Sequence, residues 1–224
     1  MPSAPTRLKP RKTPVQARAT ETRERILEAA ARVFSENGYA AGTTNRIAAA
    51  ASMSVGSLYQ YFPNKDSILV ELVRRHIDEG TARMREELAR ATAGGGSVRI
   101  TDLIGGLVDA MIANHAGDPG LHQVLFEEAP RPPELLAELH DLEESIVALA
   151  AGLIAADPAV DVADPEVAAR LVVATVESLV HRVVATRRRS VDLASFRTEL
   201  VTLITRYLSP LPSLPSQGQR AAAR

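Results

Sequence analysis

The chain has 224 residues, of which 46% are hydrophobic and 4% aromatic, and this length is enough to bury a substantial core. Abundant alanine without strand-like alternation predicts an all-α fold, and the absence of cysteine excludes disulfides and thiol catalysis. The formal net charge of −1 hides a basic stretch, with 12 Lys+Arg against 6 Asp+Glu over residues 1–75, which fits a nucleic-acid-binding module joined to an acidic body.

Residues 1–20 are predicted to form a basic, flexible arm, because four cations lie among prolines within the first twelve residues. Such an arm can track DNA phosphates or enter a minor groove, or it can remain a solvated tail. The first helix begins near Thr20 or, on the capping-box pattern of residues 13–16 with its proline, somewhat earlier. Its apolar stripe ends at the predicted stop, Gly38.

Two short helices joined by a tight turn are predicted between Thr43 and Phe62. Thr43 can cap the first of them, which runs through four alanines, and Ser54 can cap the second, which starts at Val55. The second helix must stop at Phe62, because Pro63 disfavours helical geometry in the residue before it.

The second of these helices has two different faces. At about 100° per residue, Leu58 and Phe62 project together and Gln60 lies opposite, with Tyr59 and Tyr61 at the flanks. A helix with an apolar anchor and an outer amide suits the DNA major groove, where an amide pairs with adenine and hydroxyls bond phosphates. The alternative is an ordinary helical hairpin whose tyrosines fill the rim of a core.

This region resembles the TetR family of bacterial regulators from about Ile26 to Leu72, without a gap. The family motif is a Gly-Tyr pair, a helix, a turn, and a Gly-[Ser/Thr]-Leu-Tyr-x-Tyr-Phe run followed by a lysine. Ser52 departs from it where a turn glycine is common, and Val55 where a basic or polar residue is frequent. The residues that carry the resemblance are Gly38, Tyr39, Thr43, Ile47, Ala48, Gly56, Ser57, Leu58, Tyr59, Tyr61, Phe62 and Lys65.

The resemblance implies that residues 21–65 form a three-helix DNA-binding domain with a helix-turn-helix. Lys65 resembles the family lysine that meets a phosphate; the alternative is a solvated loop charge. The residues predicted to contact DNA are Thr43, Thr44, Ser54, Val55, Gly56, Ser57, Tyr59, Gln60, Tyr61 and Lys65.

Residues 66–208 are predicted to form a larger helical domain for ligand binding and dimerisation, followed by a disordered tail at 209–224. Glycines 94–96 form a hinge, and the arginines at 187–189 fit the C-terminal end of a helix, where cations complement the dipole. Helices are expected over about 66–90, from a cap at Ser97 towards residue 117, over 121–128, from 133 to before 157, after a cap at Asp164, and over 192–208.

The resemblance also implies two functional surfaces in this domain. One is a cavity for an apolar or amphipathic small molecule, with Met111, Leu121, His122, Phe126 and Leu142 as candidate lining residues. The other is the face on which the last two helices pack against a second copy, with Leu171, Thr175, Leu179, Phe196, Leu200, Leu203, Ile204 and Tyr207 as candidate contacts.

The sequence predicts no enzyme, cofactor or metal site. Its five histidines show no metal-ligand spacing, and adjacent pairs such as Glu127-Glu128 diverge on a helix. No apolar run reaches about 18 residues and no signal peptide is evident, so we expect a cytoplasmic protein without a membrane segment. The rivals are an enzyme and a structural adaptor. We expect instead a transcriptional regulator, a repressor that binds a palindromic operator as a homodimer and is released by a small molecule.

Overall fold

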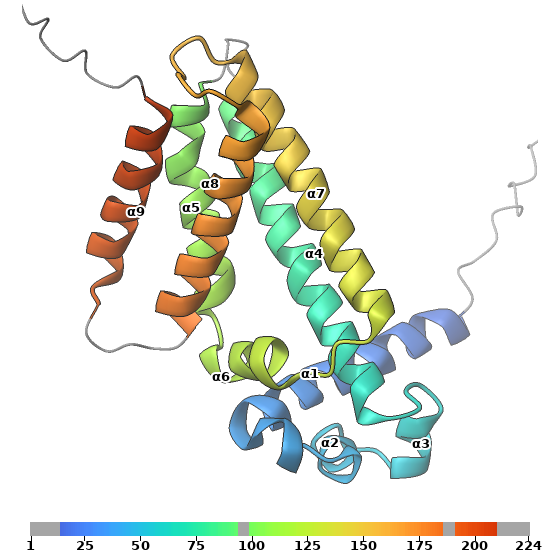
Figure 1. Cartoon of the computed structure of the whole chain (residues 1–224). Coiled ribbons are helices and arrows are strands. Elements are labelled where there is room, and N and C mark those ends of the chain that lie inside the picture. The colour runs from blue at the N-terminus through green and yellow to red at the C-terminus, as the bar shows by residue number, and fades with distance from the viewer. Residues whose placement is uncertain (1–13, 94–98, 186–190, 210–224) are drawn as a thin grey trace, which may run out of the picture. The chain divides into compact units, whose positions relative to one another are not determined.

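The computed structural model describes residues 14–93, 99–185 and 191–209, and over these ranges the chain is all-α without any strand (Figure 1). The chain divides into two compact units. Unit 1 comprises Met1–Ile77 and Asp118–Arg131, and unit 2 comprises Asp78–Gly117 and Pro132–Arg224. A segment from the middle of the chain therefore belongs to the N-terminal unit.

Helix α1 spans Pro14–Ala41 and is kinked at Gly38, where the backbone φ is 71°. It begins at the proline of the capping-box pattern, so residues 14–20, which the predicted arm included, are helical; residues 1–13 lie outside the described part. The predicted stop at Gly38 is the kink, because only glycine adopts this φ without strain. Beyond it, helical geometry resumes for one short turn.

Helices α2 (Thr44–Ala50) and α3 (Val55–Tyr59) follow, and both have the predicted caps. The Thr43 hydroxyl accepts from Arg46 N at 3.4 Å, and the Ser54 hydroxyl accepts from Ser57 N at 3.0 Å. Helix α3 is shorter than predicted, but Phe62 N still donates to Leu58 O at 3.0 Å, so a helical turn continues up to the residue before the proline.

The core of unit 1 joins the first helices to the start of α4 (Lys65–Thr92). Its members are apolar side chains from α1, α2, α3 and α4 that lie at helical spacing, as the sequence predicts. The large side chains among them that are fully buried are Ile26, Phe34, Ile47, Leu58, Ile68 and Leu69.

The remaining part of unit 1 is α6 (Pro119–Gln123) and the π-helical turn η1 (Val124–Glu128), where a single helix over 121–128 was expected. Both elements pack on α1. Ser35 Oγ donates to Asp118 Oδ1 at 2.7 Å at the start of this segment, and Tyr39 N donates to a Glu128 carboxylate oxygen at 2.8 Å at its end.

Unit 2 contains the second half of α4 together with α5 (Ile100–Ala116), α7 (Pro133–Ala156), α8 (Pro165–Val180), the π-helical turn η2 (His181–Ala185) and α9 (Leu193–Leu208). Helix α8 packs against α7, and α5 lies beside both α8 and α9 (Figure 1). These helices share one apolar core, which includes Ile104, Val108, Val147, Ala169, Val180, Ile204 and Leu208.

Acidic side chains fix the starts of α5, α8 and α9 in unit 2, whereas α7 begins with a proline. Asp164 caps α8, as predicted, and Asp192, where the last helix was expected to begin, caps α9. The predicted cap of α5, Ser97, lies outside the described residues. Ile100 N, at the start of α5, donates at 2.8 Å to the carboxylate of the buried Asp157, which is the residue that ends α7.

Ser52, in the turn between α2 and α3, has a φ of 55°. We expect Ser52→Gly to raise the free energy of unfolding by up to about 1 kcal/mol, because the relief of about 1–2 kcal/mol of left-handed strain exceeds the entropy added to the unfolded chain. Urea denaturation measures this. Ser54→Gly is the matched control: Ser54 has a φ of −73°, so that glycine should give no gain. An equal gain at both positions would show that Ser52 is not strained.

Candidate nucleic-acid interface

The helix-turn-helix presents the predicted two faces. Leu58 and Phe62 are buried in the core of unit 1, whereas Gln60 is exposed and the Tyr59 side chain is 50% exposed. Among the other predicted DNA contacts, Thr43, Ser54 and Gly56 are exposed, and Thr44, Val55, Ser57, Tyr61 and Lys65 are partly buried. Two apolar side chains of α3 and the turn that follows it thus fix the polar surface to the core of unit 1.

Hydroxyl groups on this surface are held in place by local hydrogen bonds. The Thr44 and Tyr59 hydroxyls lie 3.4 Å apart, which joins the start of α2 to the end of α3. Ser54 and Ser57 bond each other through their hydroxyls at 2.8 Å. These groups are oriented before any ligand arrives, which lowers the entropy that binding must cost.

Lys65 is a positioned cation, not a free loop charge. Its Nζ donates to Tyr39 O at 2.9 Å and lies 3.8 Å from the centroid of the Tyr39 ring. The Tyr39 hydroxyl hydrogen-bonds to Asp66, the next residue of α4. Burial, that hydrogen bond and the negative charge of Asp66 raise the pKa of Tyr39 to about 12, so the phenol stays neutral at physiological pH.

Arg46 is a further candidate contact that the sequence argument did not single out. Arg46 is exposed in the first turn of α2, and its guanidinium donates to Asn37 Oδ1 at 2.7 Å. This single bond leaves most of its five donors available for a phosphate. The sequence could have indicated this residue, because a basic side chain three residues after the predicted cap Thr43 lies in the first turn of the helix.

Comparison with known families agrees with this geometry. Residues 26–72 match the family model described as "Bacterial regulatory proteins, tetR family", and residues 100–208 match "Tetracyclin repressor-like, C-terminal domain". The chain belongs to the TetR family of transcriptional regulators. The N-terminal match covers the helix-turn-helix and the start of α4, and the second match covers the helices from α5 to α9.

Similar individual proteins include regulators of the same family. The HTH-type transcriptional regulator UidR of Escherichia coli K12 is 26% identical over 132 residues, which are 59% of this chain and 64% of UidR. The matched part thus spans less than two thirds of that relative. The structure of Salmonella enterica GusR is 27% identical, covers 91% of this chain and 99% of its own, and has a TM-score of 0.59.

The fold is also shared with more distant proteins. Bacillus subtilis FadR, solved in complex with stearoyl-CoA, is 21% identical, with a TM-score of 0.64 and coverage of 82% of this chain and 98% of its own. At this identity the similarity shows the fold alone. Within the part of this TetR-family chain that the structure describes, no helix is long and apolar enough to cross a membrane.

The five predicted ligand-lining residues are divided between the two units. Leu121, His122 and Phe126 belong to unit 1, where the rings of His122 and Phe126 stack at 4.3 Å. Met111 and Leu142 belong to unit 2 and are partly buried. No unit holds all five, and their role remains a prediction.

A buried histidine of unit 2 accompanies Met111. His115 Nδ1 hydrogen-bonds with Met111 O at 2.8 Å, and its ring lies 6.3 Å from that of His181. Burial lowers the pKa of His115 and repulsion from His181 adds to this effect, while the bond to Met111 opposes it. His115 therefore favours the neutral form.

The predicted dimer contacts need one correction. Leu200 and Ile204 are each 3% exposed and lie in the protomer's own core, because they are on the side of α9 that packs within unit 2. Leu171, Leu203 and Tyr207 are instead about half exposed, and Thr175, Leu179 and Phe196 are partly buried. Val167, one turn before Leu171, is a further exposed apolar residue that the prediction missed.

Lys65→Ala should weaken binding to any DNA sequence and should reduce the salt slope of log K by about 0.9 for each DNA-bound chain, the value for one phosphate contact. Fluorescence anisotropy at several salt concentrations measures this slope. Tyr39→Phe is the matched control: it keeps the ring and backbone carbonyl that hold Lys65, so it should leave the slope unchanged and cost about 1 kcal/mol of stability. An unchanged slope for Lys65→Ala would show that this lysine only ties α4 to α1.

Proposed function

We propose that this protein is a ligand-responsive repressor that binds a palindromic operator as a homodimer in the cytoplasm. The observation that carries the proposal is the exposed polar face of α3 and the helical turn that follows it, with Gln60 and Tyr59 outward and Leu58 and Phe62 anchored in the core. The TetR family consists of transcriptional regulators and not of enzymes, which supports this class of activity.

Each part of the exposed face suits a different component of DNA. The Gln60 amide can pair with the N6 and N7 edge of an adenine in the major groove, which gives sequence preference. The hydroxyls of Thr44 and Tyr59 and the cations of Lys65 and Arg46 suit phosphates, which set affinity and register without reading sequence.

Exposed apolar residues on α8 and α9 support a dimer. Val167 and Leu171 are each 51% exposed, Leu203 is 52% and Tyr207 is 43%, on helices that pack beside one another. Soluble monomers seldom leave such side chains together on one surface, because covering them stabilises an assembly. A two-fold dimer would carry two helix-turn-helix motifs, one for each half-site of a palindromic operator.

A small apolar or amphipathic molecule is the effector that we propose, bound in the helical body and opposing operator binding. The stearoyl-CoA complex of FadR shows an amphipathic ligand on a protein of this fold, which supports that class. Helix α4 suits the coupling, because it begins at Lys65 in unit 1 and continues without a break into the residues of unit 2. The coupling is reciprocal: if the effector lowers the affinity for operator DNA by some factor, then operator DNA lowers the affinity for the effector by the same factor.

Gln60→Ala should relax base preference at one position of each half-site, at a cost of about 1–3 kcal/mol for the preferred sequence. Selection from a randomised operator library, followed by anisotropy on single-base variants, measures this. Gln123→Ala is the matched control, since Gln123 is an exposed glutamine on α6, outside the helix-turn-helix. If both variants keep the wild-type preference, Gln60 does not read a base.

Leu203→Glu should shift the protein from dimer to monomer and lower operator affinity, without unfolding the chain, because Leu203 is already half exposed in the protomer. Sedimentation velocity and circular dichroism measure the two effects. Leu149→Glu is the matched control, with 53% exposure on α7. Loss of the dimer in the Leu149 variant but not in the Leu203 variant would move the interface from α9 to α7.

A further inference from the structure

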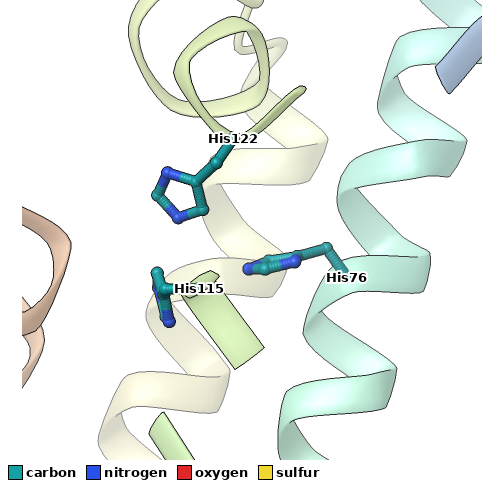
Figure 2. A group of neighbouring side chains, drawn as sticks. All are labelled: His76, His115 and His122. Carbon is teal, nitrogen blue, oxygen red and sulfur yellow. The ribbon is translucent and has the colours of Figure 1, made fainter. Parts of the chain in front are cut away.

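Two histidines that lie far apart in the sequence come together in unit 1. Figure 2 shows His76 extending from α4 and His122 from α6 into the same space. Their ring centroids are 5.4 Å apart in an edge-to-face arrangement, and a ring nitrogen of one lies within 4.8 Å of a ring nitrogen of the other. No spacing rule in the sequence indicates this pair, because the two residues belong to different helices.

Both imidazoles are held by packing. The His122 side chain is 3% exposed, and Phe126 stacks on its ring at 4.3 Å with an interplanar angle of 15°. Phe126 also lies edge-on to His76 at 5.4 Å. A shared aromatic neighbour therefore restricts the orientation of both rings.

The two backbones that carry these rings are anchored within the same unit. Asp118 caps α6 and accepts a hydrogen bond from Ser35 of α1, and Glu128, at the end of η1, accepts from Tyr39 N. His76 follows the buried α4 residues Leu72 and Val73 by one turn. The two backbones are thus fixed near each other before any ion binds, and only a small movement of the side chains remains.

We propose that His76 and His122 bind a divalent transition-metal ion of the zinc class. Zinc binds imidazole nitrogen at about 2.0–2.1 Å, so two nitrogens on one ion lie at most about 4 Å apart, and a shift of about 1 Å would bring this pair into range. Imidazole suits zinc, copper and nickel, whereas magnesium and calcium require oxygen ligands. Water molecules would complete the coordination.

The proposal is independent of operator binding and has a structural consequence of its own. An ion held by both histidines would cross-link α6 to α4 inside unit 1. Because such an ion binds the folded chain in preference to the unfolded chain, it should stabilise the protein by mass action. The alternative is a purely packed aromatic cluster of His76, His122 and Phe126, which would give no metal response.

The test uses the full-length, untagged chain after treatment with chelator, because a polyhistidine tag would itself bind metal. Titration with ZnCl₂ in a calorimeter should show one site per chain, and Zn²⁺ should raise the melting temperature. CoCl₂ should give visible d–d absorption from nitrogen ligation. MgCl₂ at the same concentration should do neither.

Variants of both residues separate ligation from packing. His76→Gln and His122→Gln should each weaken Zn²⁺ binding at least tenfold and abolish the cobalt spectrum, whereas His140→Gln, at an exposed position on α7, should leave both unchanged. If His122→Gln fails to fold, the partly buried His76 decides alone. Absence of Zn²⁺ binding by the wild type, or unchanged affinity in the His76 variant, would overturn the proposal. Operator affinity measured on the same samples keeps this result distinct from the proposed function.

Discussion

The backbone around Tyr39 is the point on which the arrangement of unit 1 depends. The Tyr39 carbonyl accepts from Lys65, its hydroxyl bonds Asp66, and its backbone N–H donates to Glu128. Tyr39, near the end of α1, therefore hydrogen-bonds both to the start of α4 and to the end of η1. The positive φ of Gly38, directly before it, turns the chain so that these groups can be reached from both sides.

This junction places polar chemistry beside the candidate DNA surface while apolar packing supplies the stability. Each of these hydrogen bonds has an ionised partner but is at least partly exposed, so each contributes about 1–2 kcal/mol, whereas the core of unit 1 buries several large apolar side chains such as Phe34, each of which contributes about 1.5–3 kcal/mol. The bonds thus select one arrangement of α1, α4 and η1 and the core makes it stable. Lys65 is held in one position by Tyr39, so a phosphate contact made by this lysine would cost little conformational entropy.

Local features of the fold were predictable from sequence because they depend on neighbours in the chain. The caps Thr43, Ser54 and Asp164 each bond an N–H two or three residues ahead, and Ser52 takes the positive φ that its place in the turn implies. Partners distant in sequence were not predictable. The stripe containing Leu200 showed that α9 buries one face, but not that this face packs within the protomer.

The same limit explains why residues 118–131 belong to unit 1. In the sequence these residues lie between α5 and α7, two helices of unit 2. Packing assigns them to unit 1, because Val124 and Leu125 are buried in a segment that lies against α1. The segment is bounded by Gly117-Asp118 on one side and Pro130 to Pro133 on the other, residues at which helices end and the chain direction changes. A fragment ending at Ile77 would lose the Glu128 acceptor at Tyr39 and the apolar cover of α1. The helix-turn-helix therefore belongs to a folded unit that the N-terminal third of the chain does not complete by itself, because α6 and η1 supply part of its packing.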